Sequence, residues 1–330
     1  MTHSVRSRVR PSALAALGLA AALGFSAPAW AQGQPQEGVR SAVGKQSAFA
    51  RFVPAEDIEA AAAQQYGQMV AQARQQNALL PDDHPQVVRL RAIAQRLVPY
   101  SLDWNKRARE WKWQVIALQS KELNAFCMPG GKIAFYTGIL EQLKLTDDEV
   151  AMIMGHEIAH ALREHARERM GKTAATKMGA NLISSLLGLG SAGDALLNMG
   201  GQLLTLRFSR EDESEADLIG MELAARAGYD PRAGVSLWQK MGAASKGAPP
   251  QWLSTHPSGT SRIQDIQANL PRVMPLFDRA ERPPRRFDAP LRMGSGTDDM
   301  QFAFWGRGDV RLGSVAWSGH AHPDHAHHAH

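Results

Sequence analysis

The pentad His156-Glu157-Ile158-Ala159-His160 constrains this chain more than any other feature of its sequence. Residues four apart share one face of a helix, so both imidazoles would point at one site. Neutral imidazole binds zinc at about 2.0–2.1 Å, and this spacing supplies two such ligands at once. Glu157 would lie beside the metal, where it can take a proton from a metal-activated water. The pentad therefore predicts a zinc site on a helix.

The helix that carries the pentad is expected to run from about Asp147 to Met170. Thr146 and Glu149 form a Ser/Thr-x-x-Glu capping box ahead of an apolar run. His165 lies nine residues after the first histidine, about half a turn away from the ligand face. We interpret His165 as a structural residue rather than a metal ligand.

A catalytic zinc takes three protein ligands and keeps one position open, so a third ligand must come from elsewhere. The longer pattern H-E-x-x-H-x-x-G-x-x-H is absent, because Arg163 stands where its glycine would be. A later acidic helix offers Glu213 and Asp217, four residues apart on one face. Glu213 can coordinate the metal while Asp217 accepts a hydrogen bond from a ligand histidine. Spacing alone leaves this undecided, and for Glu211 and Glu215 we favour a solvated acidic face.

Composition limits the class of protein. The chain has 330 residues, of which 44% are hydrophobic and 21% charged, as in globular proteins. This excludes a disordered chain, a collagen and a disulfide scaffold, and the length suits one large or two small domains. Cys127 is the only cysteine, so it cannot form an internal disulfide and is expected to be a buried small hydrophobe. The net charge of +5 is weak support for a polyanionic partner, and no nucleic acid is expected.

The N-terminus has the pattern of a secretory signal peptide over residues 1–31. Arg6, Arg8 and Arg10 precede an apolar run of about a dozen residues, and Ala29-Trp30-Ala31 is a small-x-small cleavage pattern before Gln32. The alternative is a membrane anchor, but a spanning helix needs about 20 apolar residues. We expect cleavage and export.

The rest of the chain divides into three regions. Residues 32–84 are expected to be a flexible lead-in to about residue 50 and then a helix, 85–280 a folded domain, and 281–330 a Pro/Arg-rich extension. Within the folded domain, periodicity and propensity predict further elements. These are a helix at 86–98, strands at 113–118 and 132–137 that pair as a hairpin, and a glycine turn at 130–131. They are followed by two short helices joined by a loop within 178–206 and by helices at 209–227 and 231–244. Before the folded domain, a helix is expected at 54–79.

Several ordered sequence blocks resemble metallopeptidase family 48, which includes HtpX-like, BepA-like and CAAX prenyl proteases. The resemblance covers about Pro85 to Leu270. Its blocks are Asn124-Ala125-Phe126, Pro129-Gly130-Gly131, Thr137-Gly138, the H-E-x-x-H pentad, Ser209-Arg210, Glu213-x-Glu215-Ala216-Asp217, Ala227-Gly228-Tyr229-Asp230-Pro231, His256-Pro257 and Arg262-Ile263.

The resemblance implies a fold and a ligand set. It implies an α+β, mainly helical gluzincin-type domain with a short sheet beside the active-site helix, and an edge strand over the zinc cleft. Our candidate for that edge is Ile133–Thr137; the alternative is an internal core strand. The resemblance also implies that Glu213 is the third ligand, with His156 and His160, of one Zn²⁺ per chain.

His256 lies in a predicted loop, Ser-Thr-His-Pro-Ser. In BepA-like members the matching histidine can approach the zinc and hold the enzyme inactive. The resemblance therefore implies that His256 either blocks the open zinc position or, when moved aside, stabilises the oxyanion. A lone surface histidine is the alternative.

The resemblance implies a zinc-dependent metalloendopeptidase of a bacterial-type cell envelope, with Glu157 as general base. We expect a periplasmic enzyme that cleaves unfolded or misassembled envelope polypeptides, with the glycine-punctuated segment 183–205 as a lid. HtpX-like membrane spans are missing, and peripheral membrane association is left open, as are oligomeric state and natural substrate. The rivals are a latent or non-proteolytic periplasmic zinc chaperone or binding protein, and a metal-storage protein using the histidine-rich tail at 320–330.

Overall fold

The structure is a computed structural model that describes residues 38–178, 199–245, 250–257 and 261–288. These residues belong to one compact unit, which begins at Glu37. The predicted signal peptide, most of the segment 183–205 and the histidine-rich tail lie outside the described residues. Within the described ranges, no helix is long and apolar enough to cross a membrane.

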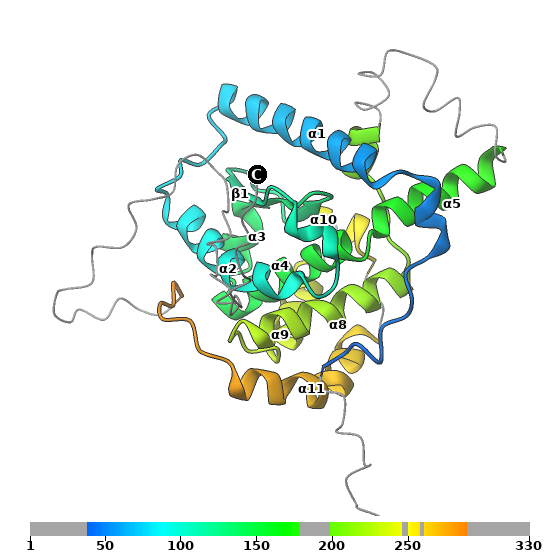
Figure 1. The fold of residues 1–330 in the computed structure, drawn as a ribbon. Helices are drawn as coiled ribbons and strands as arrows, with labels where there is room; N and C mark the ends of the chain where they lie inside the picture. Colours follow the sequence, from blue (N-terminus) through cyan, green and yellow to red (C-terminus); the bar gives the residue numbers. More distant parts are fainter. Residues whose placement is uncertain (1–37, 179–198, 246–249, 258–260, 289–330) are drawn as a thin grey trace, which may run out of the picture. The chain divides into compact units, whose positions relative to one another are not determined.

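The described elements are mainly helices with one small sheet, which confirms the predicted α+β class (Figure 1). In chain order they are α1 (Ala55–Gln75), α2 (Pro85–Ser101), β1 (Gln114–Leu118), β2 (Ala125–Met128), β3 (Lys132–Tyr136), α3 (Thr137–Gln142), α4 (Asp147–Leu162), α5 (His165–Met178), α8 (Arg210–Arg226), α9 (Ala233–Ala244), α10 (Gln251–Thr255) and α11 (Arg262–Arg279). Short 3-10 helices cover Ala48–Phe52 and Lys106–Arg109.

Local sequence signals located most helices correctly. The helices predicted at 54–79, 86–98, 209–227 and 231–244 are α1, α2, α8 and α9. The predicted capping box at Thr146 is present, since its hydroxyl accepts the Glu149 N–H and the Glu149 carboxylate accepts the Thr146 N–H. Helix α8 starts with the same device, built from Ser209 and Asp212. Both ligand-bearing helices therefore begin at well-defined positions.

The single long helix predicted up to Met170 is wrong, because α4 ends at Leu162 and α5 starts at His165. Between them Glu164 has a φ of 57°, in the left-handed region that a helix cannot contain. The side chain of Arg163 turns away to Glu215, with its Nε 2.9 Å from a carboxylate oxygen. The break brings His165 back toward the end of α4.

The sheet also differs from the prediction. The strands expected to form a hairpin are β1 and β3, and they pair in parallel. The antiparallel partner of β3 is β2, so the strand order is β1-β3-β2. The turn between β2 and β3 contains Gly130 and Gly131 with positive φ, and a Cβ on Gly131 would lie 2.7 Å from the Trp113 ring. Parallel strands need a crossover connection, and the short strand β2 lies within it.

Helix α4 lies inside the molecule, and all of its residues except Asp148 are buried. It packs on α2, α9 and β2, and most extensively on α8, which runs beside it (Figure 1). The two backbones meet where Gly155 faces Gly220, since a Cβ on Gly155 would lie 2.8 Å from the Gly220 carbonyl oxygen. This close approach sets the distance between the two helices that carry the predicted ligands.

The lead-in expected to be flexible is instead packed against the helices from residue 38 onward. We call residues 38–47 the N-terminal strap. Val39 is fully buried, and its N–H donates to Glu222 of α8 over 2.7 Å. At the other end, Phe287 N–H donates to Asp147, and Arg286 pairs with Asp148 at the start of α4. The domain boundary near 280 stays a prediction.

Candidate metal centre

Helix α4 places His156 and His160 one turn apart, as the pentad predicts. Both are buried, and their Nε2 atoms lie 3.0 Å apart. The Nδ1 atom of each ring makes a separate hydrogen bond, to Asp217 from His156 and to His165 from His160. The Nε2 atoms are therefore the ones that can face a shared ion. The two imidazoles therefore converge on one point.

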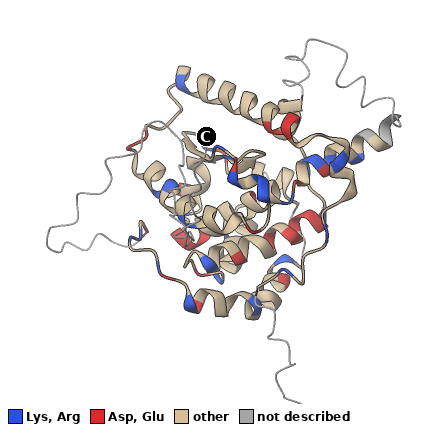
Figure 2. Ribbon diagram, viewed as in Figure 1, with Lys and Arg blue, Asp and Glu red and all other residues tan. Residues whose placement is uncertain are grey.

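The first turn of α8 is acidic (Figure 2). From this turn the carboxylate of Glu213 reaches the same point. One carboxylate oxygen lies 3.5 Å from His156 Nε2 and the other 3.4 Å from His160 Nε2. His256, at the end of α10, adds a fourth atom. Its Nδ1 lies 2.9 Å from Glu213 Oε1 and 3.3 Å from His156 Nε2.

These four residues fit a zinc ion. Their ligand atoms all lie within 4.8 Å of one another, and all four side chains are buried. Tetrahedral zinc with bonds of about 2.0–2.1 Å places its ligand atoms about 3.3–3.4 Å apart, close to the distances here. The two Nε2 atoms, 3.0 Å apart, can both turn their lone pairs to one zinc ion once neither carries a proton. His256 stands where an open catalytic position would be.

The other nitrogen of His156 is held by Asp217, an arrangement that the spacing allowed but left undecided. His156 Nδ1 lies 2.9 Å from Asp217 Oδ1. Arg262, which sequence reasoning left without a role, donates to both acids, over 2.6 Å to Asp217 Oδ1 and 2.7 Å to Glu213 Oε2. Its guanidinium also lies 3.7 Å from the centre of the Trp238 ring. The only sequence signal for Arg262 was its place in a family-like block.

The surroundings set opposite pKa shifts for the two ligand histidines of α4. Burial lowers the pKa of His160 well below its ordinary value. Burial also acts to lower the pKa of His156, but its hydrogen bonds to Asp217 and Glu213 outweigh this and raise it to about 9. Burial would raise the pKa of Asp217, but the charge of Arg262 and the bond to His156 keep it below its ordinary value. Metal binding must therefore displace a proton from His156.

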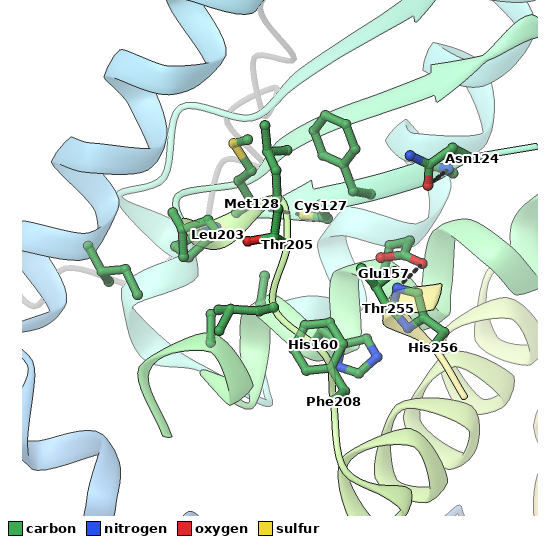
Figure 3. A pocket seen from close by; sticks show the side chains of 18 of the residues that line it. Asn124, Cys127, Met128, Glu157, His160, Leu203, Thr205, Phe208, Thr255 and His256 are labelled. Atoms are coloured by element: carbon green, nitrogen blue, oxygen red, sulfur yellow. Dashed lines mark hydrogen bonds and ion pairs between the residues drawn. The ribbon is translucent and has the colours of Figure 1, made fainter. Parts of the chain in front are cut away.

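Glu157 lies beside the cluster rather than in it. Its Oε1 accepts a hydrogen bond of 2.6 Å from the Trp252 indole N–H. The same oxygen lies 3.4 Å from His256 Nε2 (Figure 3). Trp252 was missed at the sequence level. Its position one helical turn before His256 is the signal that could have marked it. Helix α10 thus places Trp252 against Glu157, and the residue at its end, His256, next to the other three candidate ligands.

A cavity of about 400 Å³ opens beside Glu157 and His160 (Figure 3). One wall is β2, which forms an edge of the described sheet. The predicted edge strand, Ile133–Thr137, is wrong because β3 lies between two strands.

The segment 203–208 also lines the cavity, and the Phe208 ring stacks on the His160 ring with 3.9 Å between ring centres. Leu203 to Thr205, the end of the predicted lid, line this cavity as well.

Three further sequence predictions can be compared with the structure. Cys127 is buried as predicted, and burial raises the pKa of its thiol. Glu211 is exposed as expected, but a solvated role for Glu215 is wrong, because its carboxylate contacts Arg163 and His165. His165 contacts a ligand histidine, since its Nδ1 lies 2.9 Å from His160 Nδ1.

Known proteins share this region of the chain. Residues 84–270 match Peptidase family M48. The chain is 35% identical over 198 residues to mitochondrial metalloendopeptidase OMA1 of Schizosaccharomyces pombe (59% of this chain, 56% of that protein). It is 29% identical over 153 residues to metalloprotease LoiP of Escherichia coli (46% and 60%) and 28% identical over 169 residues to the beta-barrel assembly-enhancing protease of E. coli (48% and 34%). Each match spans less than two thirds of the relative's own length.

The family match covers more than half of the chain and includes every residue of the buried cluster. It confirms the resemblance noted in the sequence blocks. This chain therefore belongs to peptidase family M48.

Proposed function

We propose that this chain is a zinc-dependent metalloendopeptidase that holds one zinc ion with His156, His160 and Glu213. The observation that carries the proposal is the convergence of these three buried ligands next to the carboxylate of Glu157. The names of the relatives support it, since they are metalloendopeptidases and metalloproteases.

The residues around the site have separate chemical tasks. A bound zinc ion would supply a Lewis acid that polarises the scissile carbonyl and makes a neighbouring water more acidic. Trp252 orients the Glu157 carboxylate through Oε1. Oε2 can then accept the proton of the attacking water and pass it to the leaving amine. Asp217 and Arg262 keep His156 and Glu213 in position.

The substrate we propose is an unfolded or misassembled polypeptide. A peptide can add to the edge of β2 by main-chain hydrogen bonds, a mode that requires an extended chain but reads little sequence. The cavity beside that edge has apolar walls, among them Phe126, Met128 and Leu203. Folded proteins do not offer an extended segment of this kind, so they would escape cleavage.

We further propose a bacterial-type periplasm and a role in protein quality control. The signal-like pattern at 1–31 and the two E. coli relatives support this location, although relatives from mitochondria also match. Osmotic-shock fractionation with N-terminal sequencing tests it. A mature chain that starts at Gln32 in the periplasmic fraction is expected, and a full-length cytoplasmic chain would contradict the proposal.

Replacing Glu157 by glutamine tests the activity. Glu157→Gln should still bind one zinc per chain and should lose casein cleavage, because it removes the proton acceptor and no ligand. Metal content by mass spectrometry and release of casein peptides are the measurements. Glu211→Gln, an exposed acid on α8, is the matched control and should cleave normally. Normal cleavage by Glu157→Gln would refute the assignment of the base.

A second candidate function is a latent protease or a non-proteolytic zinc chaperone or binding protein. The observation that favours it is the position of His256, whose Nδ1 closes the fourth corner of the site. Structural zinc sites are closed by four ligands. His256→Ala distinguishes the two cases, because a latent protease should gain casein cleavage. A structural site should instead lose zinc affinity and gain no cleavage.

A further inference from the structure

His160 has a second nitrogen that determines how it can bind metal. Its Nε2 faces the cluster, so a bound metal takes the lone pair there. A neutral imidazole then carries its hydrogen on Nδ1. The partner of that hydrogen is His165 Nδ1, 2.9 Å away and fully inside the protein. The hydrogen must therefore be donated to His165.

This donation fixes the state of His165 in turn. An Nδ1 that accepts a hydrogen bond leaves the hydrogen of a neutral ring on Nε2. His165 Nε2 lies 3.3 Å from Glu215 Oε2, which can accept that hydrogen. The order of donors is thus His160, then His165, then the carboxylate of Glu215.

Glu215 is itself held from two directions. Arg163 Nε donates to Oε2 over 2.9 Å, from the residue that follows α4. Gly44 N–H of the N-terminal strap donates to Oε1 over 3.1 Å, and the Gly44 carbonyl accepts from Arg163. The carboxylate therefore has a fixed position relative to the metal cluster, although it contributes no ligand.

We propose that His165 and Glu215 are positioning residues that fix the tautomer and the ring orientation of His160 toward the metal. The two ligand histidines of α4 are then held in different ways. His156 donates directly to Asp217, whereas His160 reaches its carboxylate through a second imidazole. Partners of this kind typically change metal affinity by about 10–100-fold when they are removed. The proposal rests on zinc binding by this site.

Zinc affinity, measured by competition with a chelator, tests the relay without any need for proteolysis. His165→Leu removes the acceptor for His160 Nδ1 and should weaken zinc binding by about 10–100-fold. His165→Asn keeps an acceptor oxygen near the position of Nδ1, so it should restore most of the affinity. Equal affinity of His165→Leu and the unmodified chain would overturn the proposal.

Glu215→Gln tests the outer end of the relay. It should weaken zinc binding in the otherwise unmodified chain and have no further effect in His165→Leu, because the relay is already broken there. Glu211→Gln, an exposed acid on the same helix, is the matched control and should not change zinc affinity. Additive effects of the two relay substitutions would refute a shared path.

Histidine tautomers provide a readout that a merely structural role would not change. Long-range ¹H–¹⁵N spectra of the zinc-loaded chain should show His160 protonated at Nδ1 and His165 at Nε2. A His165 protonated at Nδ1 would overturn the proposal. If the unmodified chain bound no zinc, the proposed function would fail instead, so the two failures are distinguishable.

Discussion

Arg262 shows how much of this site depends on a single side chain. It is buried and donates to Glu213 and Asp217, and each acid in turn contacts a histidine of α4. Burying two carboxylates without a cation would cost several kcal/mol, so the guanidinium allows both acids to stay charged. Local sequence patterns do not predict these contacts, because Arg262 lies 45 residues or more from either acid in the chain.

Arg262→Met should lower the unfolding free energy of the metal-free chain by about 3–5 kcal/mol, since it removes a buried cation that pairs with two buried acids. Urea unfolding followed by circular dichroism measures this. Arg232→Met is the matched control, because the side chain of Arg232 pairs with Asp230 at the surface and is 62% exposed. A loss no larger than that of the control would show that Arg262 does not stabilise the buried acids.

The pH dependence of zinc affinity follows from the raised pKa of His156. Its pKa of about 9 means that the metal-free ring is protonated at neutral pH, and zinc must displace that proton. Apparent zinc affinity should therefore rise by up to about tenfold per pH unit between pH 6 and 8. Chelator competition at several pH values measures the slope. An affinity that is independent of pH in this range would contradict the shift.

At the scale of elements, the site is built at the crossing of two helices. Helix α4 supplies two ligands and α8 the third, and the helices touch at Gly155 and Gly220. The capping box at Thr146 was predicted from local sequence because its partner, Glu149, is only three residues away. The capping box at Ser209 has the same spacing but was found only in the structure. The close approach of the two glycines was not readable, because it depends on how distant segments pack.

Gly155→Ala should separate α4 from α8, since the added Cβ would lie 2.8 Å from the Gly220 carbonyl oxygen. We expect a loss of about 1–3 kcal/mol in unfolding free energy, as for other overpacked cores, together with weaker zinc binding. Gly67→Ala on α1 is the matched control, because no atom lies within 4 Å of its added Cβ. Unchanged zinc affinity in Gly155→Ala would show that the crossing does not set the ligand distances.

At the scale of the whole molecule, the cluster joins helices that are far apart in the chain. His156 and His256 are 100 residues apart and come from α4 and the end of α10. A ligand that binds only the folded state stabilises it, by about 2.7 kcal/mol at a concentration of 100 times its Kd. Zinc should therefore act as a cross-link between elements that sequence separates.

Removing the metal should lower the thermal unfolding midpoint of the full chain. The measurement is differential scanning calorimetry of the zinc-loaded protein before and after treatment with a chelator. His156→Gln, which removes one ligand, is the control and should show a much smaller shift. An equal shift in both proteins would mean that the chelator acts elsewhere than on this cluster.

Local sequence determined the ligand face of α4, the two helix starts and the acidic helix that supplies Glu213. These features depend on periodicity and on partners within a few residues, which any stretch of sequence carries with it. Only the tertiary structure decided the strand order, the helix break at Glu164, the approach of His256 and the contacts of Arg262 and Trp252. These features are stabilised by packing between segments that are distant in the chain, so no local sequence pattern predicts them.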